Sequence, residues 1–186
     1  MSLRNTTSSY GKVTRFFHYT VVILFILNLV IGAFHDIVSD KPLRHQVMIF
    51  HKSLGIILFF VAVLFSLWSL TSIKPLWPSS MKKLERFAAK LGHLSLYICL
   101  ILMPLSGWIM STASGKAPNF FWLFTFPMPG IPADKALAMT ANSVHNGVAW
   151  ALTIIIGLHF LAAMKHCCIC KDGIVSRMWK GTKLNK

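Results

Sequence analysis

The sequence predicts an all-α integral membrane protein, a four-helix bundle whose helices run up-down-up-down with both termini in the cytoplasm. Three observations support this fold class: a high hydrophobic content, four long apolar segments, and an uneven distribution of positive charge. Of the 186 residues, 55% are hydrophobic and 13% are charged, which is far from the balance of a soluble protein. The chain fits a single domain, residues 1–186.

Four segments are nearly free of charge over the roughly 20 residues that are needed to cross the hydrocarbon core. They cover residues 16–34, 48–70, 91–112 and 141–164. Each must be a helix, because lipid offers no partner for free backbone N–H and C=O groups. The first segment follows basic residues as a signal peptide would, but it is too long and no cleavage pattern of small residues follows. We therefore expect it to be retained.

The basic residues indicate the orientation of the bundle. The formal net charge is +14, and fourteen of the 19 basic residues fall in the amino-terminal segment, the connection between the second and third apolar segments, and the carboxyl-terminal segment. Because basic loops stay in the cytoplasm, both termini are predicted there. Topology and attraction to anionic lipid account for the charge, so we predict no nucleic-acid partner.

The connections differ in character. The first, Phe34 to Val47, is short and polar, and the second carries Pro75 and Pro78, which cannot continue a helix. The third, Ala113 to Thr140, contains an aromatic stretch over residues 119–126. Because aromatic residues favour the headgroup level, we expect this stretch to lie along the outer surface, either as an interfacial anchor or as a lid over the outer half of the bundle.

Histidines inside the apolar segments indicate a functional site, since an ionisable side chain is costly there. They are His18, His51, His93, His145 and His159. His145 and His159 are 14 residues apart, about 21 Å along one face of a helix. Following the chain through the membrane places His51 at the outer depth of His145. At the inner depth, either His18 or His93 can meet His159.

Two imidazoles facing each other across a bundle core provide what a haem iron needs for axial ligation. A zinc site would need further ligands, but the five acidic residues lie in connections or at helix ends. A porphyrin also needs room, and small residues lie beside the histidines at Gly55, Gly92, Gly147 and Gly157.

The remaining histidines and the cysteines have more than one interpretation. His166, seven residues after His159, is either a snorkelling surface residue or a proton-carrying group beside a redox substrate. His35 and His45 are expected in a solvated loop. Cys99 lies within the third segment. Cys167, Cys168 and Cys170 lie at the predicted cytoplasmic end of the fourth segment, where we expect them to be reduced or lipidated and predict no zinc site from them.

Several short motifs occur together in an order that resembles the bacterial cytochrome b561 family, four-helix dihaem membrane proteins, over nearly the whole chain. They are Arg15-Phe-Phe-His18, Phe50-His51-Lys-Ser-Leu-Gly55, Leu91-Gly-His93, Met103-Pro-Leu-Ser-Gly107, Val144-His145, Gly157-Leu-His159, Ala162-Ala-Met-Lys-His166, Lys171-Asp172 and Arg177-Met178.

The resemblance implies two haem b groups, one held by His51 and His145 at the outer side and one held by His18 and His159 at the inner side. It also implies a location in the bacterial inner membrane and ubiquinone or another quinone as electron acceptor. His166 and His93 are the candidates for the quinone site. Many members have a second histidine where Cys167 stands, so this chain departs from the family there.

The favoured function is a haem-dependent oxidoreductase that passes electrons from an outer donor to the quinone. The family's best-understood type implies superoxide as that donor. Four basic residues flank the outer entries of the helices and are candidates for steering such an anion: Arg44, Lys52, Lys116 and Lys135. The alternative is a non-enzymatic electron-carrier subunit that serves a separate dehydrogenase, with a partner redox protein in place of the small donor. A haemless proton or metal transporter is a third class, which a reduced-minus-oxidised spectrum with b-type bands would exclude.

Overall fold

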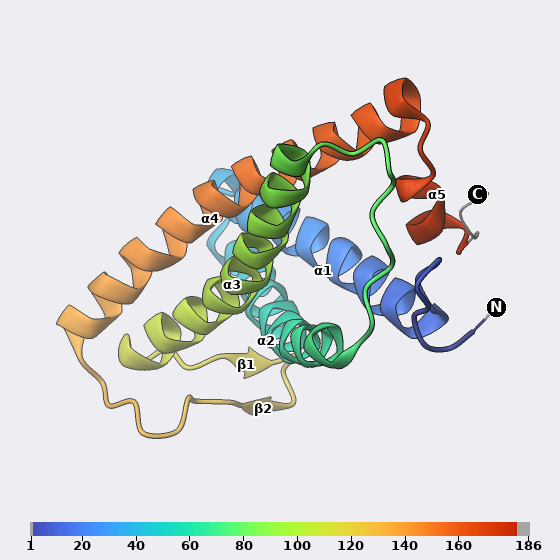
Figure 1. Cartoon of the computed structure of the whole chain (residues 1–186). Coiled ribbons are helices and arrows are strands. Elements are labelled where there is room, and N and C mark those ends of the chain that lie inside the picture. The colour runs from blue at the N-terminus through green and yellow to red at the C-terminus, as the bar shows by residue number, and fades with distance from the viewer. Residues whose placement is uncertain (1, 182–186) are drawn as a thin grey trace.

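The bundle consists of four long helices, and each packs beside the next one along the chain (Figure 1). The computed structural model describes residues 2–181. The helices are α1 (Lys12–Ile37), α2 (Lys41–Thr71), α3 (Lys83–Ala113) and α4 (Lys135–Met164), followed by a short π-helix, η1 (Lys165–Cys170), and α5 (Ile174–Trp179). Within the described residues, four helices are long and apolar enough to cross a membrane, which confirms the predicted all-α membrane fold.

All four helices extend beyond the predicted apolar segments. The first connection is three residues long, 38–40, and not the predicted Phe34–Val47. The cause is the start of α2, where Asp40 accepts a hydrogen bond from the Leu43 N–H at 2.8 Å and a proline follows within the first turn. His35 and His45 therefore lie in helical turns and not in a loop.

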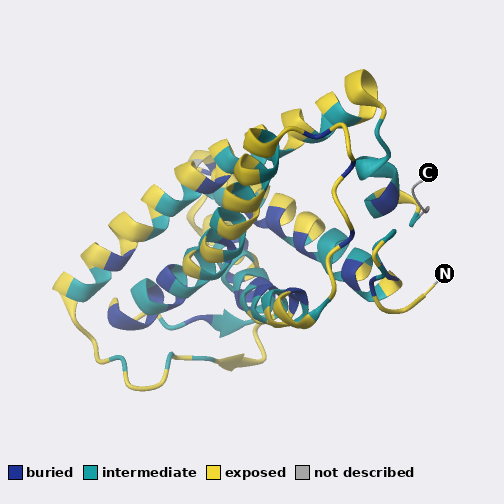
Figure 2. Cartoon of the chain, viewed as in Figure 1, coloured by how far each residue is buried: buried dark blue, intermediate teal, exposed yellow. Residues whose placement is uncertain are grey.

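The hydrophobic core lies at mid-height and draws on every long helix. Its buried members are Val21, Phe25, Leu58, Ala62, Phe65, Leu100 and Leu152. Leu152 has no exposed surface, and it lies midway along the chain between His145 and His159. The outward faces of the helices are exposed in Figure 2 and carry large apolar side chains such as Leu64 and Leu158. Apolar side chains on the outside of a bundle are what a lipid environment requires.

The amino-terminal segment, the α2–α3 connection and the carboxyl-terminal segment meet at one end of the bundle (Figure 1). The Asn5 side chain donates to the Ile73 carbonyl at 3.0 Å, and the Leu76 N–H donates to the Thr7 carbonyl at 2.8 Å. The buried Arg177 guanidinium donates to the Leu76 carbonyl at 2.8 Å. These contacts place the basic segments of the chain at the same end.

Two of the predicted inner basic residues, Lys183 and Lys186, lie outside the described residues. The assignment of this end to the cytoplasm stays a prediction from charge alone.

The aromatic stretch of the third connection forms a small hairpin, β1 (Asn119–Phe120) and β2 (Phe124–Thr125). It folds back onto the bundle: the Ser53 hydroxyl of α2 accepts from the Phe121 N–H at 2.9 Å, and the Trp108 indole of α3 donates to the Phe126 carbonyl at 2.8 Å. The tip of the hairpin stays exposed, with Leu123 at 76%. The stretch therefore covers the outer parts of α2 and α3 while its tip remains available to an interface.

Candidate functional site

His51 of α2 and His145 of α4 face each other in the half of the bundle away from the termini, which is the predicted outer half. The centres of the two imidazole rings are 6.3 Å apart, and the ring planes are nearly perpendicular, at 86°. The sequence predicted this pair from the direction of the helices and the order of the histidines, and the structure brings the two together.

Backbone carbonyls fix the orientation of both rings. His51 Nδ1 lies 3.2 Å from the Asn28 carbonyl oxygen of α1, and His145 Nδ1 lies 2.8 Å from the Met103 carbonyl oxygen of α3. A carbonyl can only accept a hydrogen bond, so each Nδ1 carries the proton. In the neutral ring this tautomer leaves Nε2 unprotonated, which is the form that binds a metal.

Two glycines allow these rings to approach the neighbouring helices closely. A Cβ at Gly107 would lie 2.9 Å from His145 Cε1, and one at Gly32 would lie 3.1 Å from His51 Cε1. Neither glycine was predicted from the sequence to make room for a histidine, although Gly107 belongs to one of the family motifs. The four glycines that were named from the sequence have open space around them: a Cβ at any of Gly55, Gly92, Gly147 or Gly157 would meet nothing within 4 Å.

The motif Met103-Pro-Leu-Ser-Gly107 supplies three groups to one face of His145. Met103 contributes the carbonyl, Ser106 places its hydroxyl 3.3 Å from His145 Nδ1, and Gly107 leaves space for the ring. The sequence contained this signal, but a single chain does not reveal that the motif faces a histidine almost forty residues later.

At the inner depth the structure gathers three imidazoles, from His18, His93 and His159. The rings of His93 and His159 are in edge contact, with centres 5.3 Å apart, and His159 also interacts electrostatically with His18. His93 Nδ1 donates to the Ala89 carbonyl at 2.6 Å. His18 Nδ1 is buried without a hydrogen-bond partner among the described residues.

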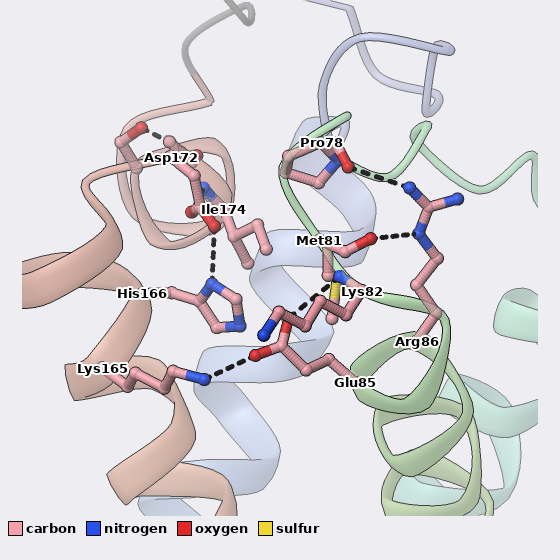
Figure 3. A network of polar contacts seen from close by, with 11 residues as sticks. Pro78, Met81, Lys82, Glu85, Arg86, Lys165, His166, Asp172 and Ile174 are labelled. Atoms are coloured by element: carbon pink, nitrogen blue, oxygen red, sulfur yellow. Dashed lines mark hydrogen bonds and ion pairs between the residues drawn. The ribbon is translucent and has the colours of Figure 1, made fainter.

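His166 is held at the inner end of the bundle by a carboxylate. Its Nδ1 donates to Asp172 at 2.6 Å, and the two side chains are 12% and 7% exposed (Figure 3). This burial does not match a snorkelling surface residue. Beside it, Lys165 pairs with Glu85 of α3 at 2.5 Å. Among the described contacts, none joins His166 directly to His93.

The predicted outer face carries an open cavity of about 740 Å³, which is lined by residues of all four long helices and of the α3–α4 connection. Three of the four predicted steering residues line it, Lys52, Lys116 and Lys135, together with Asp134. The Lys52 ammonium donates to the Lys116 carbonyl at 3.0 Å. Arg44 does not line the cavity. It donates a hydrogen bond to the ring of His35, and His35 is one of the lining residues.

A family model described as prokaryotic cytochrome b561 matches residues 9–181. The chain belongs to this family. It is also similar to cytochrome b561 homolog 2 of Escherichia coli strain K12, with 34% identity over 181 residues, 96% of this chain and 95% of that protein. The resemblance inferred from the motifs is thus confirmed. As a prokaryotic cytochrome b561, the chain is a multi-pass b-type cytochrome of a lipid bilayer and serves electron transfer.

Haem b is typical of the cytochrome b561 family, and the outer histidine pair fits it. The two imidazoles meet from facing helices with ring centres 6.3 Å apart, and each could supply one nitrogen to a haem iron. The carbonyl partners hold both rings in the tautomer that ligation needs.

Proposed function

We propose that this cytochrome b561 is a single-domain dihaem oxidoreductase of the bacterial inner membrane, with both termini in the cytoplasm. It takes electrons from a donor at the outer face and delivers them to a membrane quinone. The observation that carries the proposal is the outer pair, His51 and His145, whose Nδ1 atoms donate to carbonyls and whose Nε2 atoms have no hydrogen-bond partner among the described residues.

For the inner haem we propose His18 and His159 as ligands. The separation of the His93 and His159 ring centres, 5.3 Å, is 1 Å shorter than that of the outer pair and suits a direct ring contact. The buried His18 Nδ1 has no hydrogen-bond partner among the described residues, so that ring keeps a nitrogen available.

Bound haem iron supplies the one-electron chemistry, and its axial ligands and surroundings tune the potential. The chain positions the haems, excludes water from the core and supplies protons at the inner end. The apolar core around Leu152 keeps water from the space between the two histidine pairs. At the inner end, quinone reduction consumes protons, and the imidazole of His166, oriented by Asp172, can hold and donate one. His93 is the second candidate beside the quinone.

For the donor we propose superoxide. The outer cavity brings the ammonium groups of Lys52, Lys116 and Lys135 to one opening, and Lys52 directly follows the ligand His51. A cavity lined by positive charge raises the local concentration of a small anion and its association rate.

Haem stoichiometry tests the ligand assignment. His51→Ala or His145→Ala should each lower the content of the purified protein from about two haems per chain to one, because each site depends on its own pair of axial ligands. Pyridine haemochrome content per protein and the reduced-minus-oxidised spectrum measure this. His45→Ala is the matched control, an exposed histidine on the same helix as His51. Loss of both haems from a folded variant would contradict two independent sites.

Salt dependence tests the donor. The rate of haem reduction by superoxide, followed by stopped flow, should fall as ionic strength rises toward roughly 0.15 M, where the Debye length is about 8 Å. Lys52→Gln combined with Lys116→Gln should lower the rate and flatten this dependence with haem content unchanged. Lys41→Gln, on the exposed start of α2 and outside the cavity lining, is the control. A rate indifferent to salt and to these changes would favour the electron-carrier function with a partner protein.

A further inference from the structure

Three side chains of different chemistry converge where α4 ends. His166, Cys170 and Asp172 each offer one ligand atom, and these atoms lie within 4.8 Å of one another. The local backbone brings them together: α4 passes into the π-helix η1, Lys171 then adopts a left-handed conformation with φ of 50°, and Gly173 follows with φ of 78°. This reversal returns Asp172 to the ring of His166. π-helical segments inside helices occur frequently at functional sites.

We propose that His166, Cys170 and Asp172 form a binding site for Zn²⁺. An imidazole nitrogen, a thiolate and a carboxylate are the three ligand types that zinc takes in proteins. With bonds of about 2.0–2.3 Å, tetrahedral ligands lie roughly 3.3–3.8 Å apart. The present separations therefore require movements on the order of 1 Å, within reach of a side-chain rotation. Three protein ligands leave the fourth position to water.

The surroundings allow exchange with the aqueous phase. Cys170 is exposed, whereas His166 and Asp172 are mostly buried, so a metal ion can enter from the side of the thiol. A thiolate and a carboxylate balance the charge of the ion. Lys165 near Cys170 and Arg177 near Asp172 oppose its binding, although Lys165 is paired with Glu85.

From the sequence we predicted no zinc site among the three cysteines. The site uses one cysteine, with a histidine four residues before it and an aspartate two residues after it. Cys167 and Cys168 are exposed and lie outside the ligand group. They are therefore matched controls for Cys170, with the same chemistry on the same π-helix.

Zinc at this site would engage the imidazole that the proposed function assigns to proton delivery, so its effect on quinone reduction depends on that proposal. The binding itself does not. Metal binding and quinone kinetics are therefore measured separately on the same preparation.

The experiment uses the full-length, haem-loaded protein with reduced thiols and with any affinity tag removed. Zn²⁺ is titrated in competition with a chromophoric chelator of known zinc affinity, and X-ray absorption at the zinc edge reports the ligands. We expect one tight zinc per chain with one sulfur ligand and nitrogen or oxygen ligands. Cys170→Ser and Asp172→Asn should each weaken binding tenfold or more, and Cys168→Ser should leave it unchanged. Haem spectra confirm that every variant is folded.

Two results would overturn the site: no zinc bound by the wild-type protein at micromolar concentration, or equal loss in Cys168→Ser and Cys170→Ser, which would indicate non-specific thiol binding. Bound zinc that slows quinone reduction in the wild-type protein and spares Cys170→Ser would support both proposals. Bound zinc with unchanged quinone reduction would support the site and contradict the proton role of His166.

Discussion

Gly107→Ala should displace His145 and weaken the outer haem site while leaving the inner one intact. The added Cβ would lie 2.9 Å from His145 Cε1 and 3.0 Å from its Nδ1, where ordinary contact begins near 3.4 Å. The ring must move away from α3 by about half an ångström. Because Met103 is also on α3, the movement would lengthen the 2.8 Å bond to its carbonyl toward the limit of about 3.2 Å for a hydrogen bond.

Inserting a methyl group into a well-packed site costs about 1–3 kcal/mol. If the cost falls on the haem-bound state, binding of the outer haem weakens roughly 5- to 150-fold, since 1.4 kcal/mol is a factor of ten. Helix stability would change in the opposite direction, because alanine is about 1 kcal/mol better than glycine inside a helix. A loss of haem therefore would not arise from a weaker α3.

The assay is titration of haem b into apoprotein in detergent, followed by the Soret band, together with the haem content of protein as isolated. Gly32→Ala should show a smaller effect, because its Cβ would lie 3.1 Å from His51 Cε1. Gly92→Ala is the matched control: it is the same substitution on α3, and it meets nothing within 4 Å. If Gly107→Ala bound two haems as tightly as Gly92→Ala, the fit of His145 between Met103 and Gly107 would have no part in haem binding.

Two further predictions concern the core and the inner end. Leu152→Ala should lower the free energy of unfolding by about 2–5 kcal/mol, because the side chain is fully buried, whereas Leu161→Ala, 64% exposed on the same helix, should change it little; thermal unfolding in detergent compares them. His166→Ala should keep both haems but slow reduction of a soluble quinone several-fold, because the proton held against Asp172 is lost. Unchanged quinone kinetics in stopped flow would remove His166 from the quinone site.

The sequence predicted the parts of the fold that lipid dictates. Apolar length alone locates four helices, because a single segment surrounded by lipid must satisfy its own backbone hydrogen bonds. The spacing of His145 and His159 along such a helix then places one imidazole at each of two depths. It could not locate the helix ends. At α2 the start depends on the cap at Asp40, a contact among polar residues beyond the hydrocarbon.

The site was predicted where it depends on chain direction and on the depth of each histidine, and it was missed where it depends on close contacts between helix surfaces. The His51 and His145 pairing follows from chain direction. The contact of Gly107 with His145 joins α3 to α4, and no spacing within either helix encodes it. The convergence of Cys170 with His166 depends on the π-helical winding of η1 and the chain reversal after it, which the order of residues alone does not indicate.

In the proposed dihaem function, the buried layer at Leu152 would also make electron transfer sensitive to membrane voltage. His145 and His159, one from each proposed pair, are 14 residues apart on α4. An electron that passes between their depths therefore moves about 21 Å through a hydrocarbon core about 30 Å thick. It therefore crosses roughly two-thirds of the electric potential. At 100 mV this amounts to about 1.6 kcal/mol, or roughly a tenfold change in equilibrium constant. In the proposed orientation an inside-negative potential opposes the inward electron, so an energised membrane should restrain quinone reduction by its own charge.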